Sequence, residues 1–177
     1  MALRLTLHPA AGLATAALLA ICPPSAAAQG QGRPTCDAPE FRQFDFWVGD
    51  WDVTVSGQPA GTNMVTLEEA GCVVHEHWKG SRGGTGQSFN FYDRQDRKWH
   101  QVWVSNSGNA LFLTGSREGN LLTLVGESTQ ADGSTVLNRL SFRNNPDHTV
   151  RQFWETSSDG GTTWTPTFDG LYRKRKA

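Results

Sequence analysis

The sequence has few cysteines, almost no net charge, and no long apolar run after its first 28 residues. Its 177 residues include three cysteines, two methionines and two tyrosines, and the formal net charge at pH 7 is −1. A chain without an excess of basic residues creates no field that attracts nucleic acid or an anionic membrane. A membrane span needs about 20 apolar residues in a row. We therefore expect neither a nucleic-acid partner nor a membrane span.

Established catalytic and cofactor-binding motifs are also missing. The chain has no Gly-x-Ser-x-Gly elbow, no glycine-rich phosphate loop, no Cys-x-x-Cys pair and no recognisable Ser-His-Asp arrangement. His75 and His77 alternate on an expected strand, so both imidazoles could bind one ion, with His100 as a third ligand. No spacing completes that set, and strand histidines are more often hydrogen-bonded or solvent-facing. We predict no metal and no cofactor.

The first 28 residues have the pattern of a secretory signal peptide. Arg4 gives a positive start, residues 10–21 are small or apolar, and Ala26-Ala27-Ala28 fits the small-x-small cleavage rule. Cleavage is expected before Gln29. An alternative takes Leu19–Cys22 as a lipoprotein box with a lipidated Cys22, although Ile21 fits poorly where a small residue is expected. The prediction is a periplasmic or secreted protein.

Two cysteines, Cys36 and Cys72, remain after cleavage. An exported chain meets an oxidising compartment, where an even number of cysteines favours a disulfide. Residues 29–43 are rich in Gly, Pro and Gln and are predicted as a flexible leader, held down only by such a bridge. Residues 44–177 then form the folded domain, with one helical turn expected near residues 39–46.

From Phe44 onward the chain consists of short alternating segments separated by turn residues, and many of its 19 glycines stand between the segments. This pattern is typical of antiparallel β structure. The expected strands are Trp51–Val55, Asn63–Glu69, Val73–Trp78, Gln87–Tyr92, Trp99–Ser105, Ala110–Ser116, Leu121–Glu127, Val136–Arg143, Thr149–Thr156 and Thr163–Tyr172.

Short strands at a spacing of about 8–12 residues predict either a β-sandwich or a β-barrel. The immunoglobulin pattern of two cysteines around a central tryptophan is missing. Short turns between consecutive strands favour up-and-down closure, which removes exposed sheet edges. The predicted fold is therefore all-β, a single antiparallel up-and-down barrel of about eight to ten strands.

The stretch "FDFWVGDWDV" resembles the Gly-x-Trp signature of lipocalins and related calycins, here Gly49 and Trp51. Together with "GCVVHEHWKG", "KWHQVWV" and "FDGLYRKR", it is similar to a bacterial family of exported lipocalin-like proteins of unknown function. The resemblance implies a calycin barrel in which the tryptophan closes one end and packs against a basic residue near the C-terminus. Arg173 is the expected partner. The family brings no established catalytic residues.

One face of four expected strands combines aromatic side chains with amides or a carboxylate. Flat apolar area with a few fixed polar groups is what a small-molecule cavity needs. The opposite face carries His75, His77, Phe89 and Val102, and could instead line a barrel that binds lipid. We favour the first face, whose candidate ligand-binding residues are Glu76, Trp78, Asn90, Gln101, Trp103, Gln152 and Trp154.

These residues predict an exported barrel that binds a small, partly aromatic or amphipathic molecule. A second hypothesis is a cofactor-independent isomerase, cyclase or lyase in which Glu76, desolvated by its neighbours, acts as an acid or base. A third is a protein-interaction module that uses the outer surface of a filled barrel. The sequence carries no indication of the ligand's identity or of an oligomeric state.

Overall fold

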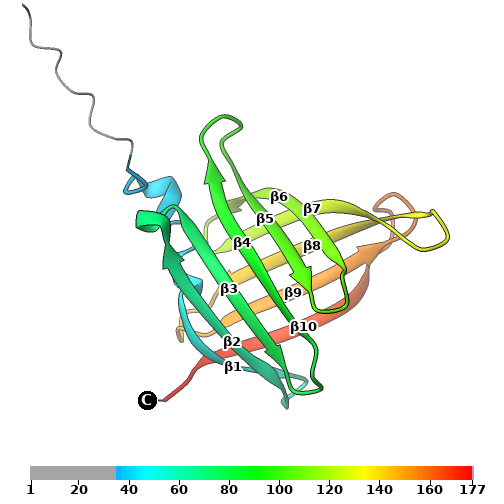
Figure 1. The fold of residues 1–177 in the computed structure, drawn as a ribbon, viewed down its shortest axis with the longest axis horizontal. Coiled ribbons are helices and arrows are strands. Elements are labelled where there is room, and N and C mark those ends of the chain that lie inside the picture. The colour runs from blue at the N-terminus through cyan, green and yellow to red at the C-terminus, as the bar shows by residue number, and fades with distance from the viewer. Residues whose placement is uncertain (1–34, 177) are drawn as a thin grey trace, which may run out of the picture. The chain divides into compact units, whose positions relative to one another are not determined.

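A computed structural model describes residues 35–176, which form ten antiparallel strands in one closed barrel (Figure 1). Each strand pairs with its neighbours in the chain, and β1 pairs with β10 to close the ring. The predicted all-β up-and-down barrel is confirmed. The strands are β1 Gly49–Val55, β2 Gln58–Glu68, β3 Val73–Gly80, β4 Thr85–Asp93, β5 Lys98–Ser105, β6 Ala110–Glu118, β7 Leu121–Thr129, β8 Thr135–Asn144, β9 Val150–Ser157 and β10 Thr165–Lys174.

Strand β2 begins five residues earlier than the sequence pattern predicted. Ser56 and Gly57 both have positive φ and make a two-residue hairpin turn, so pairing with β1 resumes at once. Pro59 and Gly61 made this stretch resemble a loop. The register shifts opposite Val53 and Thr54, because β2 has one extra residue, Ala60, between Pro59 and Gly61. A proline is tolerated at such an irregularity.

The predicted signal peptide, residues 1–28, and the first residues of the predicted leader lie outside the described part of the chain. Within residues 35–176, the structure contains no helix of the length and hydropathy that crossing a membrane requires.

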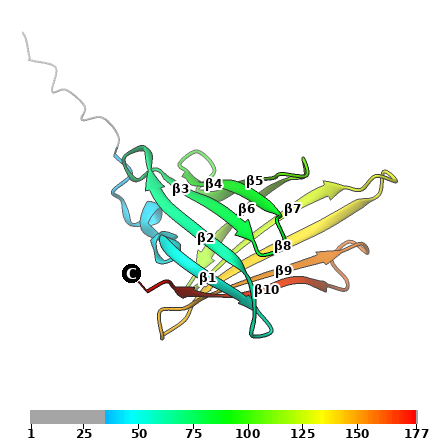
Figure 2. The ribbon, with the colours of Figure 1, turned by 60° about the horizontal axis from the view of Figure 1, so that its bottom comes forward.

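The segment before β1 is bound to the barrel by covalent and apolar contacts. The predicted Cys36–Cys72 disulfide is present and joins this segment to the residue just before β3. Two short 3₁₀ helices follow, η1 Pro39–Arg42 and η2 Asp45–Trp47, where one helical turn was expected. Phe41 is buried and makes an edge contact with Tyr92. Figure 2 shows the segment, coloured blue to cyan, at one end of the barrel.

Aromatic side chains fill that end of the barrel. Phe44 and Trp47 are fully buried and stack with ring centroids 4.9 Å apart. Phe142 of β8 packs against both rings, and Trp99 of β5 meets Phe44 edge-on. Contacts of this kind, between four rings from three parts of the chain, close this end of the barrel.

Gly49 and Trp51 lie at this closed end, at the start of β1. Trp51 is fully buried, and its Nε1 donates a hydrogen bond to the Trp47 carbonyl oxygen at 2.8 Å. Gly49 has φ +145°, and a Cβ there would lie 3.0 Å from Lys174 Nζ. The motif therefore needs glycine for its backbone conformation, whereas the Lys174 side chain could move to make space for a Cβ.

The basic residue over the Trp51 ring is Lys174 and not the expected Arg173. Lys174 Nζ lies 5.2 Å from the ring centroid and donates to the Val48 carbonyl oxygen at 3.2 Å. Lys174 is the residue directly opposite Trp51 in the β1–β10 ladder. Paired residues share a face and successive residues alternate, so Arg173 points to the other face and is exposed.

Candidate functional site

A cavity of about 250 Å³ lies inside the barrel, away from the closed end. Indoles from three strands form much of its wall: Trp78 of β3, Trp103 of β5 and Trp154 of β9. Each stands near the C-terminal end of its strand, and Phe168 of β10 meets Trp78 edge-on. The remaining lining residues are Glu76, Gln101, Leu111, Leu140, Gln152 and Tyr172.

Two of the indoles depend on glycines in the neighbouring strands for their space. A Cβ added at Gly86 of β4 would lie 2.2 Å from the Trp103 ring. A Cβ added at Gly61 of β2 would lie 2.8 Å from the Trp78 ring and even closer to backbone. These glycines let the large rings lie flat along the inner sheet surface, which leaves open volume between them.

A buried hydrogen-bond network begins at Glu76, which is only 3% exposed. Asn63 Nδ2 donates to Glu76 Oε1 at 2.7 Å, and Ser88 Oγ donates to Oε2 at 2.6 Å. Ser88 in turn accepts a hydrogen bond from Asn90 Nδ2 at 2.9 Å, and Gln101 Nε2 donates to Asn90 Oδ1 at 2.7 Å. The network crosses β2, β3, β4 and β5 and fixes the carboxyl group and the three amides, of Asn63, Asn90 and Gln101, in place.

A second polar group lies on the β9–β10 side of the cavity. The Tyr172 hydroxyl donates to Gln152 Oε1. On the neighbouring strand β8, Asn138 Oδ1 accepts a hydrogen bond from Trp154 Nε1 at 3.1 Å, which fixes the orientation of that indole. Gln152 and Tyr172 therefore add polar groups to the cavity from β9 and β10, and Tyr172 lies close to the Glu76 network.

Burial raises the pKa of Glu76 to about 7, although the hydrogen bonds from Ser88 and Asn63 and the charge of His75 act in the opposite direction. Burial, together with the nearby Glu76 charge, raises the pKa of Tyr172 well above its ordinary value. A carboxyl group whose pKa is near neutrality can both donate and accept a proton at physiological pH.

Six of the seven predicted ligand-binding residues line this cavity: Glu76, Trp78, Gln101, Trp103, Gln152 and Trp154. The seventh, Asn90, is fully buried behind them and bonds to Gln101. The sequence interpretation did not include Asn63, Ser88, Phe168 or Tyr172. Alternation could have found Ser88, because it is two residues from the predicted Asn90 on β4. Phe168 and Tyr172 share a face of β10, a strand on which no ligand-binding residue was predicted.

None of the residues that line the cavity is a histidine. His75 and His77 alternate with Glu76 on β3 and therefore belong to the outer face of the barrel. His100 lies elsewhere, stacked on Phe91 and 2.9 Å from an Asp96 carboxylate oxygen. The sequence hypothesis that His100 could complete a set with the first two is wrong.

The free energy of unfolding should fall as pH rises from about 4.5 to about 7, because native Glu76 retains a proton in this range that the unfolded chain releases. Each unit of pKa difference corresponds to about 1.4 kcal/mol, so the Glu76 contribution to this fall is about 3 kcal/mol. Glu76→Gln should lack this contribution. Urea melts between pH 4.5 and 8, in buffer containing EDTA, measure the difference.

Glu118→Gln, at an exposed position of β6, is the matched control and should keep the wild-type pH profile. The groups that face Glu76 from other strands, Asn63, Ser88 and Tyr172, are unchanged in both variants. Parallel pH profiles for wild type and Glu76→Gln would show that the carboxyl titrates normally.

The chain matches no protein-family model and no curated protein. The closed ten-strand antiparallel barrel is compatible with the calycin-like fold that the Gly-x-Trp motif suggested. Evidence about function therefore comes from the cavity itself.

Proposed function

We propose that the protein binds a small, partly aromatic or amphipathic molecule inside the barrel. The observation that carries this proposal is the combination of three indoles and Phe168 with Glu76, Gln101 and Gln152 around one open volume. Binding cavities are usually apolar with a few placed polar groups. Burying amides and a carboxyl group costs free energy, so a barrel whose inner side chains only fill it is expected to have apolar groups at these positions.

The polar groups indicate what the ligand presents to them. Gln101 Nε2 donates one of its two N–H groups to Asn90 Oδ1, and its Oε1 can accept a hydrogen bond from a ligand. Gln152 Oε1 is used by Tyr172, so its amide N–H groups remain to donate. A flat ring with one hydroxyl or carbonyl group suits this arrangement, since it stacks on the indoles while its polar atom reaches a glutamine.

We place this binding outside the cytoplasm, in the periplasm or the surrounding medium. The Cys36–Cys72 disulfide supports an oxidising compartment. The signal-peptide pattern of residues 1–28 supports export, and no nucleic-acid partner is expected from a net charge of −1.

A first probe is 2-naphthol, a flat bicyclic ring with one hydroxyl group. Calorimetric titration should show one site per barrel, and Trp103→Ala should weaken binding by about tenfold or more, equivalent to about 1.4 kcal/mol. Gly86→Ala should weaken binding as well, because its Cβ displaces the Trp103 ring. Naphthalene, which lacks the hydroxyl, should bind more weakly than 2-naphthol if a glutamine contacts that group.

Trp164→Ala is the matched control. Trp164 lies in the β9–β10 hairpin beneath Arg139 and does not line the cavity. Its removal should leave the affinity for 2-naphthol unchanged. Equal effects of Trp103→Ala and Trp164→Ala, or a folded protein that takes up neither naphthol nor related small aromatics, would contradict the proposal.

A second candidate function is cofactor-independent proton transfer by Glu76, favoured by a pKa of about 7 within the cavity. An acid–base residue of this kind would take a proton from a ligand carbon and return one to the same or another atom. The probe is 2-tetralone in D₂O, whose acidic C–H groups would exchange for deuterium. Glu76→Gln should abolish any catalysed exchange and keep binding if Glu76 is catalytic, whereas affinity should fall if it only anchors the ligand.

A further inference from the structure

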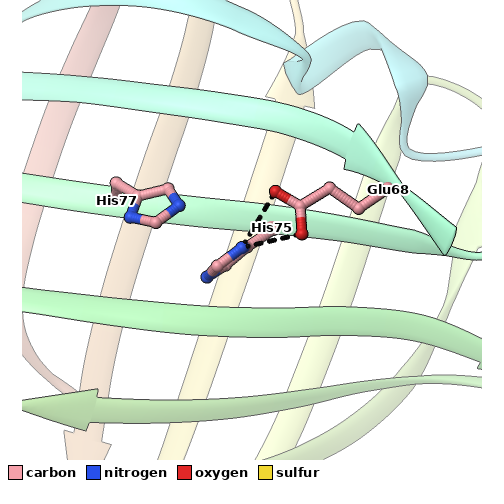
Figure 3. Close-up of side chains that lie close together, drawn as sticks. All are labelled: Glu68, His75 and His77. Carbon is pink, nitrogen blue, oxygen red and sulfur yellow. Dashed lines mark hydrogen bonds and ion pairs between the residues drawn. The ribbon is translucent and has the colours of Figure 1, made fainter.

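Three potential metal ligands lie together on the outer face of the barrel (Figure 3). Glu68 is the last residue of β2, and His75 and His77 alternate on β3, on the face opposite Glu76. One ligand atom from each residue lies within 4.8 Å of the others. The His75 side chain is 10% exposed and the Glu68 side chain 42%, so the group is anchored on one side and open to solvent on the other.

The hydrogen bonds of His75 are not satisfied by a neutral imidazole. Its Nδ1 lies 3.1 Å from both carboxylate oxygens of Glu68, and its Nε2 lies 3.0 Å from Gln87 Oε1. Both neighbours are acceptors, but a neutral imidazole has one N–H. A second proton, a turned Gln87 amide or a metal ion at Nδ1 would each resolve the conflict. Of these three explanations, only a metal ion also accounts for the position of His77 beside the other two side chains.

Surrounding contacts hold the ligand side chains as a metal site requires. Phe89 stacks on the His75 ring, with centroids 4.3 Å apart and planes at 17°. Thr66 Oγ1 donates to Glu68 Oε1 at 2.7 Å and orients the carboxylate. Metal-binding histidines commonly donate their second N–H to an oxygen, and Gln87 Oε1 is placed to accept from Nε2.

We propose that Glu68, His75 and His77 bind a divalent late transition-metal ion of the Zn²⁺ class. Three atoms no more than 4.8 Å apart lie within about 2.8 Å of a common point, that is 4.8 Å divided by √3. Bonds from Zn²⁺ to histidine nitrogen and carboxylate oxygen are about 2.0–2.2 Å, so each ligand atom moves by less than about 1 Å. Two imidazole ligands favour Zn²⁺ over Mg²⁺ or Ca²⁺.

The ion would have three protein ligands, and its solvent side is open to water or to a further ligand. Sites of this composition, two histidines and one glutamate, keep a coordination position free. This metal site is distinct from the cavity, because His75 and His77 face outward while Glu76 between them faces inward. The two sites can therefore be tested separately.

The test is calorimetric titration of the untagged, EDTA-treated and dialysed protein with Zn²⁺, with the disulfide intact. One ion should bind per chain. His77→Ala should weaken binding strongly, and Gln87→Ala, which removes only the acceptor on His75 Nε2, should weaken it by about 10–100-fold. Co²⁺ in place of Zn²⁺ should give visible absorption that His77→Ala removes. Circular dichroism checks that each variant is folded.

Two control variants separate this site from other histidines. His148→Ala changes the β8–β9 turn and should leave Zn²⁺ affinity unchanged. His100→Ala changes a second group of possible ligands, with Asp93 and Asp96, and should also leave it unchanged. Failure of the folded protein to bind Zn²⁺ would overturn the proposal, as would binding that His100→Ala removes and His77→Ala does not.

Discussion

Replacing Trp51 with alanine is expected to lower the free energy of unfolding by about 3–5 kcal/mol, as for other buried aromatic truncations. The side chain is fully buried and contacts Tyr172 edge-on, with centroids 6.3 Å apart. Its Nε1 also satisfies the Trp47 carbonyl oxygen, which the variant leaves without this donor. Urea melts of the two proteins measure the change.

Double-mutant cycles test which basic residue acts with Trp51. Lys174→Ala should cost about 0.5–1 kcal/mol in the wild type, through loss of its contact with the indole face, and almost nothing in the Trp51→Ala background. Arg173→Ala is the matched control on the neighbouring residue, and its effect should add to that of Trp51→Ala. Coupling of Trp51 to Arg173 and not to Lys174 would mean that β10 is paired one residue out of the register described.

Removing the disulfide is expected to lower the free energy of unfolding by about 4 kcal/mol in the chain-entropy model. The bridge joins residues 36 apart in the sequence and restricts the unfolded chain accordingly. It also holds the segment that delivers Phe44 and Trp47 to the closed end of the barrel. The comparison is between the oxidised protein and the Cys36→Ser, Cys72→Ser double variant in urea.

Wild-type protein kept reduced in the melt is the control for the two serine substitutions, and its stability should match that of the double variant. Intact mass before and after alkylation verifies the oxidised starting state. Two alkylated thiols without prior reduction, or equal stability of the oxidised and double-variant proteins, would refute the expected contribution.

Alternation predicted most of the fold because each strand buries one face and exposes the other. On β3, β4, β5 and β9 the inner positions hold aromatics and amides that are unusual enough to identify the inner face before any pairing is known. The start of β2 was missed because Pro59 and Gly61 are typical of loops. Their place in a strand depends on a bulge in β2 itself, where Ala60 is an extra residue between Pro59 and Gly61.

Contacts between strands depend on the strand register, which the residue pattern of a single strand does not predict. Lys174 and not Arg173 meets Trp51 because of the β1–β10 pairing, which a shift of one residue would reverse. Glu68 approaches His75 because β2 and β3 form a hairpin in which Thr66 pairs with His75, two residues away from Glu68. The sequence spacing of seven residues gives no sign of that contact.

The seven tryptophans offer a direct test of the cavity. Three line it, Trp78, Trp103 and Trp154. Three are buried toward the closed end, Trp47, Trp51 and Trp99, and Trp164 lies in the β9–β10 hairpin. Each indole N–H gives one resonance in a ¹H–¹⁵N spectrum, and single substitutions assign them.

The most direct measurement is therefore the set of indole resonances during a titration with 2-naphthol. Binding in the cavity predicts saturable shifts of Trp78, Trp103 and Trp154, with the three closed-end indoles and Trp164 nearly unchanged. Shifts confined to Trp164, or no saturable shift of any cavity indole with 2-naphthol or related small aromatics, would contradict the account of this barrel as a small-molecule-binding protein.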